Sequence, residues 1–391
     1  MLDLSKVLAG PLCAMYLGDM GADVIKVESP AGDETRGWPP FHHDAQDVAT
    51  GAVFFSANRN KRSIAVDLRE AAGRRVVQRL AGASDVVIES FGPGVAERLG
   101  VDAGTLCTDN PRLVHCRISG YGSVGPMRQG KGYDVILQAF SGMLSITGER
   151  GGPPVRSPFS PVDQATGLHA LIGILARLHE RERTGRGGTV EASLFDTATG
   201  FLGYFLQSYW ARGTEPERAG SGHESLCPYE AFDTADKPLI LGVANDGLWR
   251  RFCALSGLEA FVDRPEFRTN ADRVRHREAT VALVRAKLIE RTRDAWIAAL
   301  TEAGIPCSPL HTLGELAAHP HSLASDMIRT CHDPAIGHWR TVSQPLRFDG
   351  ERPPPRRPPP RLGEDGPSVL RGAGFPDAEI DALVASGAVK T

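Results

Sequence analysis

The chain has 391 residues, of which 41% are hydrophobic and 23% charged, a balance typical of a globular protein rather than a disordered or fibrous one. Its formal net charge of −3, from 44 basic and 47 acidic residues, excludes the strong basic field that draws proteins to nucleic acid or to anionic membranes. A chain of this length exceeds what a single hydrophobic core usually supports, so we expect two globular units.

The first 120 residues alternate β-rich runs with helical patterns, which predicts a Rossmann-like parallel sheet with helices on its faces. The segment 165–178 is apolar almost all round, which is typical of a helix buried in a core. Its apolar side chains include Leu168, Ile172 and Leu175. The expected strands lie at residues 22–28, 62–67, 85–89 and 112–118.

A second, smaller α/β domain is expected after residue 205, where the pattern changes to a polar, glycine-containing loop. Its expected elements are one strand and three helices, at residues 238–244, 248–256, 275–291 and 294–303. The proline-rich run 353–360 favours an extended linker over an SH3-type ligand, and it leads to a final helix at 377–386. The predicted domains are residues 1–205 for the first part of the large domain, 206–325 for the linker and small domain, and 326–391 for the return to the large domain.

Seven cysteines are scattered along the chain without a C-x-x-C pair, which favours reduced thiols in the cytoplasm over disulfides or a zinc site. We find no signal-peptide pattern and no run of roughly 18 apolar residues, so we expect no membrane segment. The histidine clusters at 42–44 and 319–321 lack a second cluster with ligand spacing, so we expect no metal site.

The first strand-to-helix turn, at Gly10 and Pro11, has the outline of a nucleotide-binding βαβ unit. It lacks the G-x-G-x-x-G fingerprint through which the backbone approaches a dinucleotide, so a nicotinamide dehydrogenase is not favoured. Pro11 instead suits the first turn of a helix. A serine hydrolase is disfavoured in the same way, because the chain has no G-x-S-x-G motif.

Several cations are expected at the ends of predicted strands, where open α/β sheets bind ligands. Scattered arginine is also common on solvated surfaces, so it is the position of these residues that favours phosphate binding. The residues are Lys61, Arg62, Arg69, Arg98 and Lys131.

Asp163 directly precedes the apolar helix and has two interpretations. As a helix N-cap it would accept hydrogen bonds from N–H groups of the first turn. The same helix end would also keep the carboxylate ionised, and an ionised carboxylate beside glycine-rich loops can attack an activated acyl carbon. The spacing alone does not separate a cap from a nucleophile.

A set of motifs follows the order found in one known family, at residues 7–11, 17–28, 32–36, 60–64, 89–94, 132–134, 184–187 and 362–364. Together they resemble the class III CoA-transferases, the family of formyl-CoA transferase and carnitine CoA-transferase. The resemblance runs from end to end and is strongest before residue 200. It implies a large α/β domain built from both chain ends, a small domain between them, and two ring-like subunits interlocked as a homodimer.

By this resemblance Asp163 is the nucleophile, and CoA is a substrate rather than a tightly bound cofactor. Arg69, Arg98 and Lys131 are expected near the CoA phosphates. Phe91 is expected against either the adenine or the pantetheine arm. The full set of expected CoA contacts is Leu8, Ala9, Leu68, Arg69, Ser90, Phe91, Gly92, Arg98, Lys131 and Tyr133.

The implied activity moves CoA from an acyl-CoA thioester, with succinyl-CoA as a candidate donor, to a free carboxylic acid. Asp163 would form an aspartyl anhydride and then aspartyl-CoA, without a general base, because a carboxyl with a pKa of about 3.9 is ionised at neutral pH. Ser29 and the short loop 220–224 depart from the formyl-CoA enzymes, which argues against formyl-CoA and oxalate as substrates. Arg36 and His223 are candidates for binding a second carboxylate.

An α-methylacyl-CoA racemase of the same family, with Asp163 as an acid/base, is the nearest rival. Racemases place a histidine where this chain has Tyr133, and a phenol with a pKa of about 10 suits proton transfer poorly. Asp233 falls near a racemase carboxylate, so the rival stays open at this point. A catalytically silent CoA-binding protein would lack Asp163.

Overall fold

Contacts between residues divide the chain into two compact units in a computed structural model, which describes residues 1–44, 46–334 and 336–390. The first unit comprises Met1–Met143, Ser157–Ala211 and Pro320–Thr391, and the second comprises Leu144–Arg156 and Arg212–His319. The first unit therefore takes both ends of the chain. The segment 144–156, which the sequence analysis assigned to the large domain, belongs to the second unit, and the expected boundary after residue 205 falls inside a helix.

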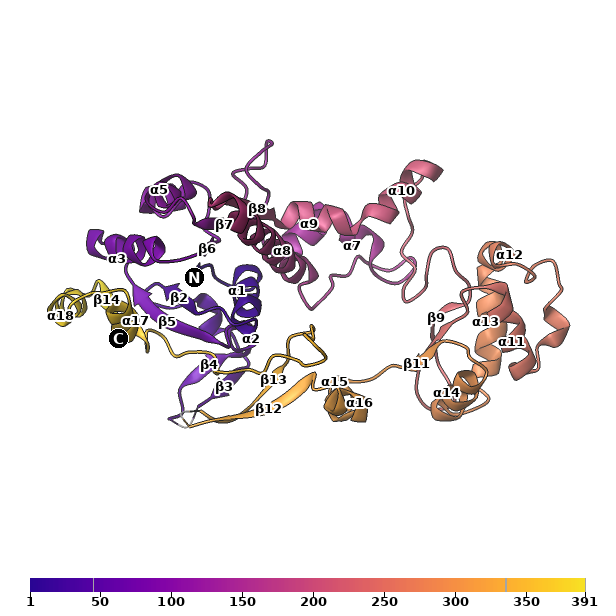
Figure 1. Cartoon of the computed structure of the whole chain (residues 1–391). Helices are drawn as coiled ribbons and strands as arrows, with labels where there is room; N and C mark the ends of the chain where they lie inside the picture. Colours follow the sequence, from indigo (N-terminus) through magenta and orange to yellow (C-terminus); the bar gives the residue numbers. More distant parts are fainter. Residues whose placement is uncertain (45, 335, 391) are drawn as a thin grey trace. The chain divides into compact units, whose positions relative to one another are not determined.

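A seven-stranded sheet in the order β14-β5-β2-β1-β6-β7-β8 forms the centre of the first unit (Figure 1). Its first six strands in chain order pair in parallel, whereas the short β14 adds to one edge in the antiparallel direction. The strands are β1 (Leu2–Leu4), β2 (Val24–Glu28), β5 (Lys61–Val66), β6 (Val86–Glu89), β7 (Val114–Ser119), β8 (Gly188–Ser193) and β14 (Val389–Lys390).

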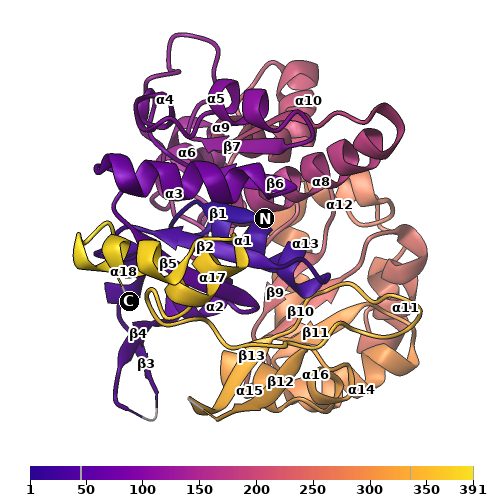
Figure 2. The same ribbon diagram turned by 60° about the vertical axis from the view of Figure 1, so that its left-hand side comes forward.

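Helices cover both faces of this sheet because its strands are apolar on both sides. In β6, for example, Val87 enters one core while Val86 and Ile88 enter the other. The first core contains side chains of α3 (Ala71–Gly82), α4 (Val95–Leu99), α5 (Ala103–Asp109), α17 (Gly366–Gly372) and α18 (Asp377–Ala385). The second contains side chains of α1 (Ala9–Asp19), α6 (Asp134–Phe140), α8 (Pro161–Thr184) and α9 (Leu194–Phe201), and Figure 2 gives another view of these helices.

Shorter elements complete the first unit. They are a 3-10 turn η1 (Glu34–Gly37), the hairpins β3 (Phe41–His43) with β4 (Ala49–Gly51) and β12 (Ile328–Asp333) with β13 (Gly337–Val342), and the helices α2 (Ala52–Ala57) and α16 (Pro320–Ala324). Two further helices, α7 (Met143–Ile146) and α10 (Gly203–Arg212), contain two of the four points at which the chain passes from one unit to the other. The proline-rich run 353–360 is neither helix nor strand, as its composition predicted.

The second unit is a small antiparallel sheet in the order β11-β10-β9, packed with helices. Its core contains the buried side chains of Trp249, Phe252 and Trp296. The elements are β9 (Tyr229–Phe232), β10 (Leu239–Gly242), β11 (Cys307–Pro309), α11 (Asp246–Ser256), η2 (Glu259–Phe261), α12 (Asn270–Arg275), α13 (Arg277–Leu288), α14 (Arg293–Glu302) and α15 (Leu313–Ala318). The expected strand at 238–244 and the expected helices of this region are confirmed, except that the helix expected at 275–291 starts after a break that separates α12 from α13.

One expectation about α8 is wrong. Leu171 and Ile174 are buried, but Leu168, Ile172 and Leu175 are 42%, 64% and 42% exposed. The helix therefore buries one side against the sheet and leaves an apolar side uncovered in the single chain, which an all-round apolar pattern does not distinguish from full burial. No helix within residues 1–44, 46–334 and 336–390 is long and apolar enough to cross a membrane.

Candidate active site

The starts of helices α1 and α8 are held close together by glycines. A Cβ atom at Gly167, one helical turn after Asp163, would lie 2.5 Å from the carbonyl oxygen of Ala9. A Cβ atom at Gly10 would lie 2.2 Å from the hydroxyl of Ser5, so this turn also requires glycine. Because neither backbone tolerates a larger residue here, the first turn of α8 is fixed against the first turn of α1.

Asp163 is not the N-cap of α8. The cap is Ser160, in a left-handed conformation and without a side-chain capping bond, and Asp163 is the third helical residue. The orphan N–H groups of the helix are taken instead by Asp134, at the start of α6. One Asp134 oxygen, Oδ2, accepts from the N–H of Val162 at 2.9 Å and from the N–H of Asp163 at 3.1 Å. The capping role that the sequence analysis considered for Asp163 therefore belongs to a different carboxylate.

The Asp163 carboxyl group is electrostatically unusual. Burial and the nearby negative charge of Asp134 raise the pKa of Asp163 to about 7. Within the part of the chain that the structure describes, no group donates a hydrogen bond to this carboxyl group. The expectation of an ordinary carboxyl held ionised by the helix end is thus wrong, because the helix N–H groups that would stabilise the anion are bonded to Asp134.

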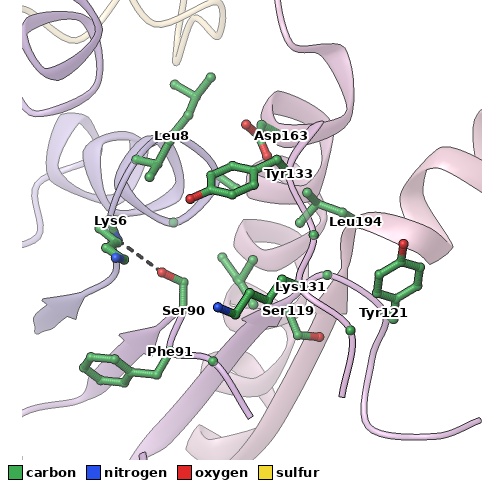
Figure 3. Close-up of a pocket in the computed structure, with 18 of the residues that line it drawn as sticks. Lys6, Leu8, Ser90, Phe91, Ser119, Tyr121, Lys131, Tyr133, Asp163 and Leu194 are labelled. Atoms are coloured by element: carbon green, nitrogen blue, oxygen red, sulfur yellow. Dashed lines mark hydrogen bonds between the residues drawn. The ribbon is translucent and has the colours of Figure 1, made fainter. Parts of the chain in front are cut away.

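A cavity of about 300 Å³ opens beside Asp163 (Figure 3). It lies at the carboxyl ends of β6 and β7 and at the start of α1, which is where open parallel sheets bind ligands. We call it the smaller cavity. Eight of the eleven residues proposed from the sequence line it, namely Leu8, Ala9, Ser90, Phe91, Gly92, Lys131, Tyr133 and Asp163.

A larger cavity of about 930 Å³ shares Lys6, Glu34 and Phe91 with the smaller one, so the two are adjacent. The remaining three proposed residues, Leu68, Arg69 and Arg98, line this larger cavity. Phe91 borders both spaces, so its position does not choose between an adenine and a pantetheine contact. The structure thus brings all eleven proposed residues to two adjoining cavities of the first unit.

The cations around these cavities differ in availability. Arg98 in the larger cavity and Arg128 and Lys131 in the smaller one form no ion pair with an acidic side chain in the described ranges of the chain. Arg69 is 2.6 Å from Asp67 and Lys6 is 3.5 Å from Glu34. The first three are therefore the cations most open to an anionic ligand.

Three other expected cations are committed elsewhere. Lys61 is 1% exposed and pairs with Asp3 at 2.8 Å, so it does not reach a ligand. Arg62 pairs with Asp23. Arg36 forms two hydrogen bonds with the Glu28 carboxylate, at 2.7 and 2.8 Å, which overturns its assignment to a second substrate carboxylate.

Two contacts that hold the loop after β6 were not expected from the sequence. Glu89 ends β6, and its carboxyl accepts a hydrogen bond from the N–H of Phe91 at 2.7 Å. Burial raises the pKa of Glu89 to about 7. The backbone N–H of Lys6 donates to the Ser90 hydroxyl, which ties the loop after β1 to the loop after β6 (Figure 3). A motif signal was present, since residues 89–94 belong to the resemblance, but it did not reveal these contacts.

A cluster of aromatic side chains adjoins the smaller cavity at Tyr121. Tyr121, which lines it, packs edge-on against Phe140 with 5.1 Å between ring centroids, and Phe140 packs against Phe195 at 5.8 Å. A glycine pair supports the same loop, because a Cβ at Gly132 would lie 2.6 Å from the Cα of Gly120. No group of three or more potential metal ligands occurs among residues 1–44, 46–334 and 336–390.

A partly buried carboxyl without hydrogen-bond donors, next to unpaired cations, suits an enzyme that acts on an acyl substrate bearing phosphates. Comparison with known proteins agrees. The model of CoA-transferase family III matches residues 1–366, and the chain belongs to this family. An acyl-CoA transferase of Fusarium pseudograminearum (strain CS3096) is 40% identical over 97% of this chain and 84% of its own length.

Two further relatives support the assignment. The succinyl-CoA:glutarate CoA-transferase of Mus musculus is 35% identical over 100% of this chain and 89% of its own length. The crystal structure of a CaiB/BaiF family protein from Brucella suis matches with a TM-score of 0.85 at 34% identity, and covers 95% of this chain and 97% of that one. The protein is thus a CoA-transferase of family III, and the racemase interpretation is not favoured.

Proposed function

We propose that the protein transfers CoA from succinyl-CoA to a second dicarboxylic acid, with Asp163 as the nucleophile. The observation that carries this proposal is the Asp163 carboxyl, which is partly buried, accepts no hydrogen bond from the described residues and lines the smaller cavity. A carboxylate that has lost part of its water without gaining other donors is a stronger nucleophile than one in solution. The relative from Mus musculus, whose name specifies succinyl-CoA and glutarate, supports the substrate class.

The reaction proceeds by acyl exchange on Asp163. The carboxylate attacks the thioester carbonyl, the C–S bond breaks, and a mixed anhydride and a CoA thiolate result. The thiolate then attacks the Asp163 carbonyl, which releases the donor acid and leaves an aspartyl-CoA thioester. The acceptor carboxylate attacks this thioester, and the thiolate finally takes the acceptor acyl group and frees Asp163. No proton is consumed and the thioester energy is retained, so ATP is not needed.

The unpaired cations divide between the two charged parts of the substrates. Arg98, in the larger cavity, and Lys131, in the smaller one, suit the CoA phosphates. Arg128 lines the smaller cavity together with Asp163, and we assign to it the second carboxylate of a dicarboxylic acid, in place of Arg36. A planar guanidinium binds a carboxylate through two hydrogen bonds, which favours Arg over Lys in this role.

We also propose a homodimer. The uncovered apolar side of α8, with Leu168, Ile172 and Leu175, supports it, because contiguous exposed apolar surface usually marks an interaction site. The interlocked form of the dimer and the cytoplasmic location stay predictions. All seven cysteines are free thiols, which supports a reducing location.

A panel of acyl-CoA donors and free acids tests the activity. Each pair is incubated with the enzyme and CoA exchange is followed by mass spectrometry. We expect the fastest exchange for succinyl-CoA with a dicarboxylate acceptor, and slower exchange for monocarboxylates of similar length. Borohydride reduction during turnover should modify Asp163. Exchange of the α-proton of an acyl-CoA without any transfer of CoA would refute the proposal.

A further inference from the structure

Asp134 has no direct place in the reaction above, yet it makes the contacts that define the first turn of α8. Its side chain is 6% exposed and lies at the first position of α6. Oδ2 accepts two backbone hydrogen bonds, from Val162 and Asp163, and Oδ1 accepts one from the Gln138 amide. Both oxygens of this carboxylate are therefore occupied within the protein.

Gln138 anchors Asp134 in turn. Its Oε1 accepts from the N–H of Ser157 at 2.9 Å, and its Nε2 donates to the carbonyl oxygen of Ser157 at 3.2 Å. Both Asp134 and Gln138 belong to α6, so one helix fixes the chain just before α8 and also caps α8. The position of the Asp163 backbone is thus determined by a side chain from another helix.

This arrangement has a consequence for Asp163. An aspartate at the third position of a helix ordinarily gains stability from the positive end of the helix and its N–H donors. Here a second carboxylate occupies the donors of the second and third residues. The negative charge that compensates the helix end is therefore on Asp134, and the Asp163 oxygens are left without those bonds.

We propose that Asp134 is a positioning residue for the reaction, which caps α8 in place of Asp163 and so leaves the nucleophilic oxygens unbonded and available for attack. This inference rests on the proposed function, because it requires Asp163 to be the nucleophile. The charged or titratable groups that line the smaller cavity around Asp163 are Lys6, Glu34, Tyr121, Arg128, Lys131 and Tyr133. Asp134 itself does not line this cavity, but its negative charge raises the pKa of Asp163.

The test compares the pH dependence of kcat/KM for the wild type and for Asp134→Asn. With an Asp163 pKa of about 7, the wild-type rate at pH 6 is expected to be about one tenth of the rate at pH 8, since only the ionised form attacks. Asparagine keeps an oxygen that can accept the helix N–H bonds but removes the charge. In Asp134→Asn we therefore expect the rate at pH 6, divided by the rate at pH 8, to rise severalfold above the wild-type value. The rate at pH 8 should itself fall about tenfold, because the nucleophile is less basic and less well placed.

Gln138→Met is the matched control, because it removes the anchor of Asp134 and keeps its charge. It should lower thermal stability but leave the ratio between pH 6 and pH 8 near the wild-type value. An Asp134→Asn enzyme with the wild-type ratio and rate overturns the proposal, as does one that is folded yet inactive at every pH, which would place Asp134 among the reacting groups. If Asp134→Asn does not fold, Asp134→Ser, whose hydroxyl can also accept an N–H bond, carries the same expectations. The wild type reports separately on the proposed function, because absence of CoA exchange in it would refute that function whatever the variants do.

Discussion

Two charged groups near the start of α1, Lys61 and Asp163, differ in how many hydrogen bonds the protein gives them. Lys61 is 1% exposed, and its ammonium donates to a carboxylate, a carbonyl and an amide oxygen, those of Asp3, Pro11 and Asn58, at 2.7–2.8 Å. All three of its hydrogens are used. Asp163, by contrast, is partly buried and accepts no hydrogen bond from the described residues.

Burial lowers the pKa of the Lys61 ammonium to about 8 in spite of its bonds to Asp3, so a second carboxyl, Asp33, gives the closer comparison with Asp163. Burial acts to raise the pKa of Asp33, but Lys26 at 3.2 Å and two hydrogen bonds from Thr35 hold it below its usual range. Around Asp163 burial acts in the same direction, and the neighbouring charge of Asp134 adds to it instead of opposing it. A satisfied buried charge supports the fold, whereas an unsatisfied one costs stability and retains reactivity.

The largest effect is expected from Asp163→Asn on activity. The amide cannot form the anhydride, so CoA exchange should fall by about 10⁴-fold or more, while the circular dichroism spectrum stays unchanged. Exchange is measured with the donor and acceptor acid that the wild type uses best. Asp294→Asn, at an aspartate in the first turn of α14 that lines neither cavity, should keep wild-type activity. Substantial CoA transfer by Asp163→Asn would remove Asp163 from the mechanism.

Lys61→Met tests the contribution of the buried Lys61–Asp3 ion pair to stability. Loss of the ammonium leaves the buried Asp3 carboxylate without the cation that is hydrogen-bonded to it, so the free energy of unfolding should fall by about 3–5 kcal/mol. Urea denaturation at fixed protein concentration measures the change. The neighbouring Arg62→Met breaks an exposed pair with Asp23 and should cost less than about 1 kcal/mol. Equal losses for both variants would show that burial does not distinguish the two pairs.

A smaller effect on stability is expected where α8 packs against α1. Gly167→Ala places a methyl group against the Ala9 carbonyl, so the helices must separate, at a cost of about 1–3 kcal/mol in unfolding free energy. CoA transfer should fall with it, because Asp163 moves relative to the start of α1. Gly200→Ala in α9, where an added methyl group meets nothing within 4 Å, should instead be neutral or stabilising by up to about 1 kcal/mol. A Gly167→Ala enzyme with unchanged stability and activity would contradict the tight crossing.

The sequence predicted the elements better than their surroundings. Local β-rich runs predicted the strands at 24–28 and 86–89, and the prolines of 353–360 predicted a segment that is neither helix nor strand. Such patterns act over a few neighbouring residues, so they can be read from the sequence. The set of residues around the two cavities came from family motifs. Neither source could show that Lys61 is buried, because its three acceptors lie on separate segments of the chain.

Asp163 illustrates the same limit at the site itself. Its position before α8 was readable from the sequence, but its pKa depends on Asp134, which is 29 residues away and belongs to another helix. The exposed side of α8 is a second case, since the apolar pattern around Ile172 does not say which side the sheet covers. In both cases the missing information is which distant segments of the chain pack against the residue.

A further prediction concerns the stability cost of leaving the Asp163 carboxyl without hydrogen-bond donors. The pKa of Asp163 is raised from 3.8 to about 7 in the folded protein, so this group favours the folded state most below pH 4, and that contribution is lost as the pH rises through about 7. Asp163→Asn removes the titration. The difference in Tm between Asp163→Asn and the wild type should therefore become more positive between pH 5 and pH 8.

The matched control for this last prediction is Asp33→Asn, whose carboxylate is satisfied by Lys26 and Thr35. Its pKa is lowered in the folded protein, so its stabilising contribution is present above the unfolded pKa and lost in acid. Asp33→Asn should consequently lower Tm, and by more at pH 8 than at pH 3. Thermal unfolding followed by circular dichroism separates the two behaviours, and a Tm difference for Asp163→Asn that does not grow with pH would mean that the nucleophile is kept at no cost to the fold.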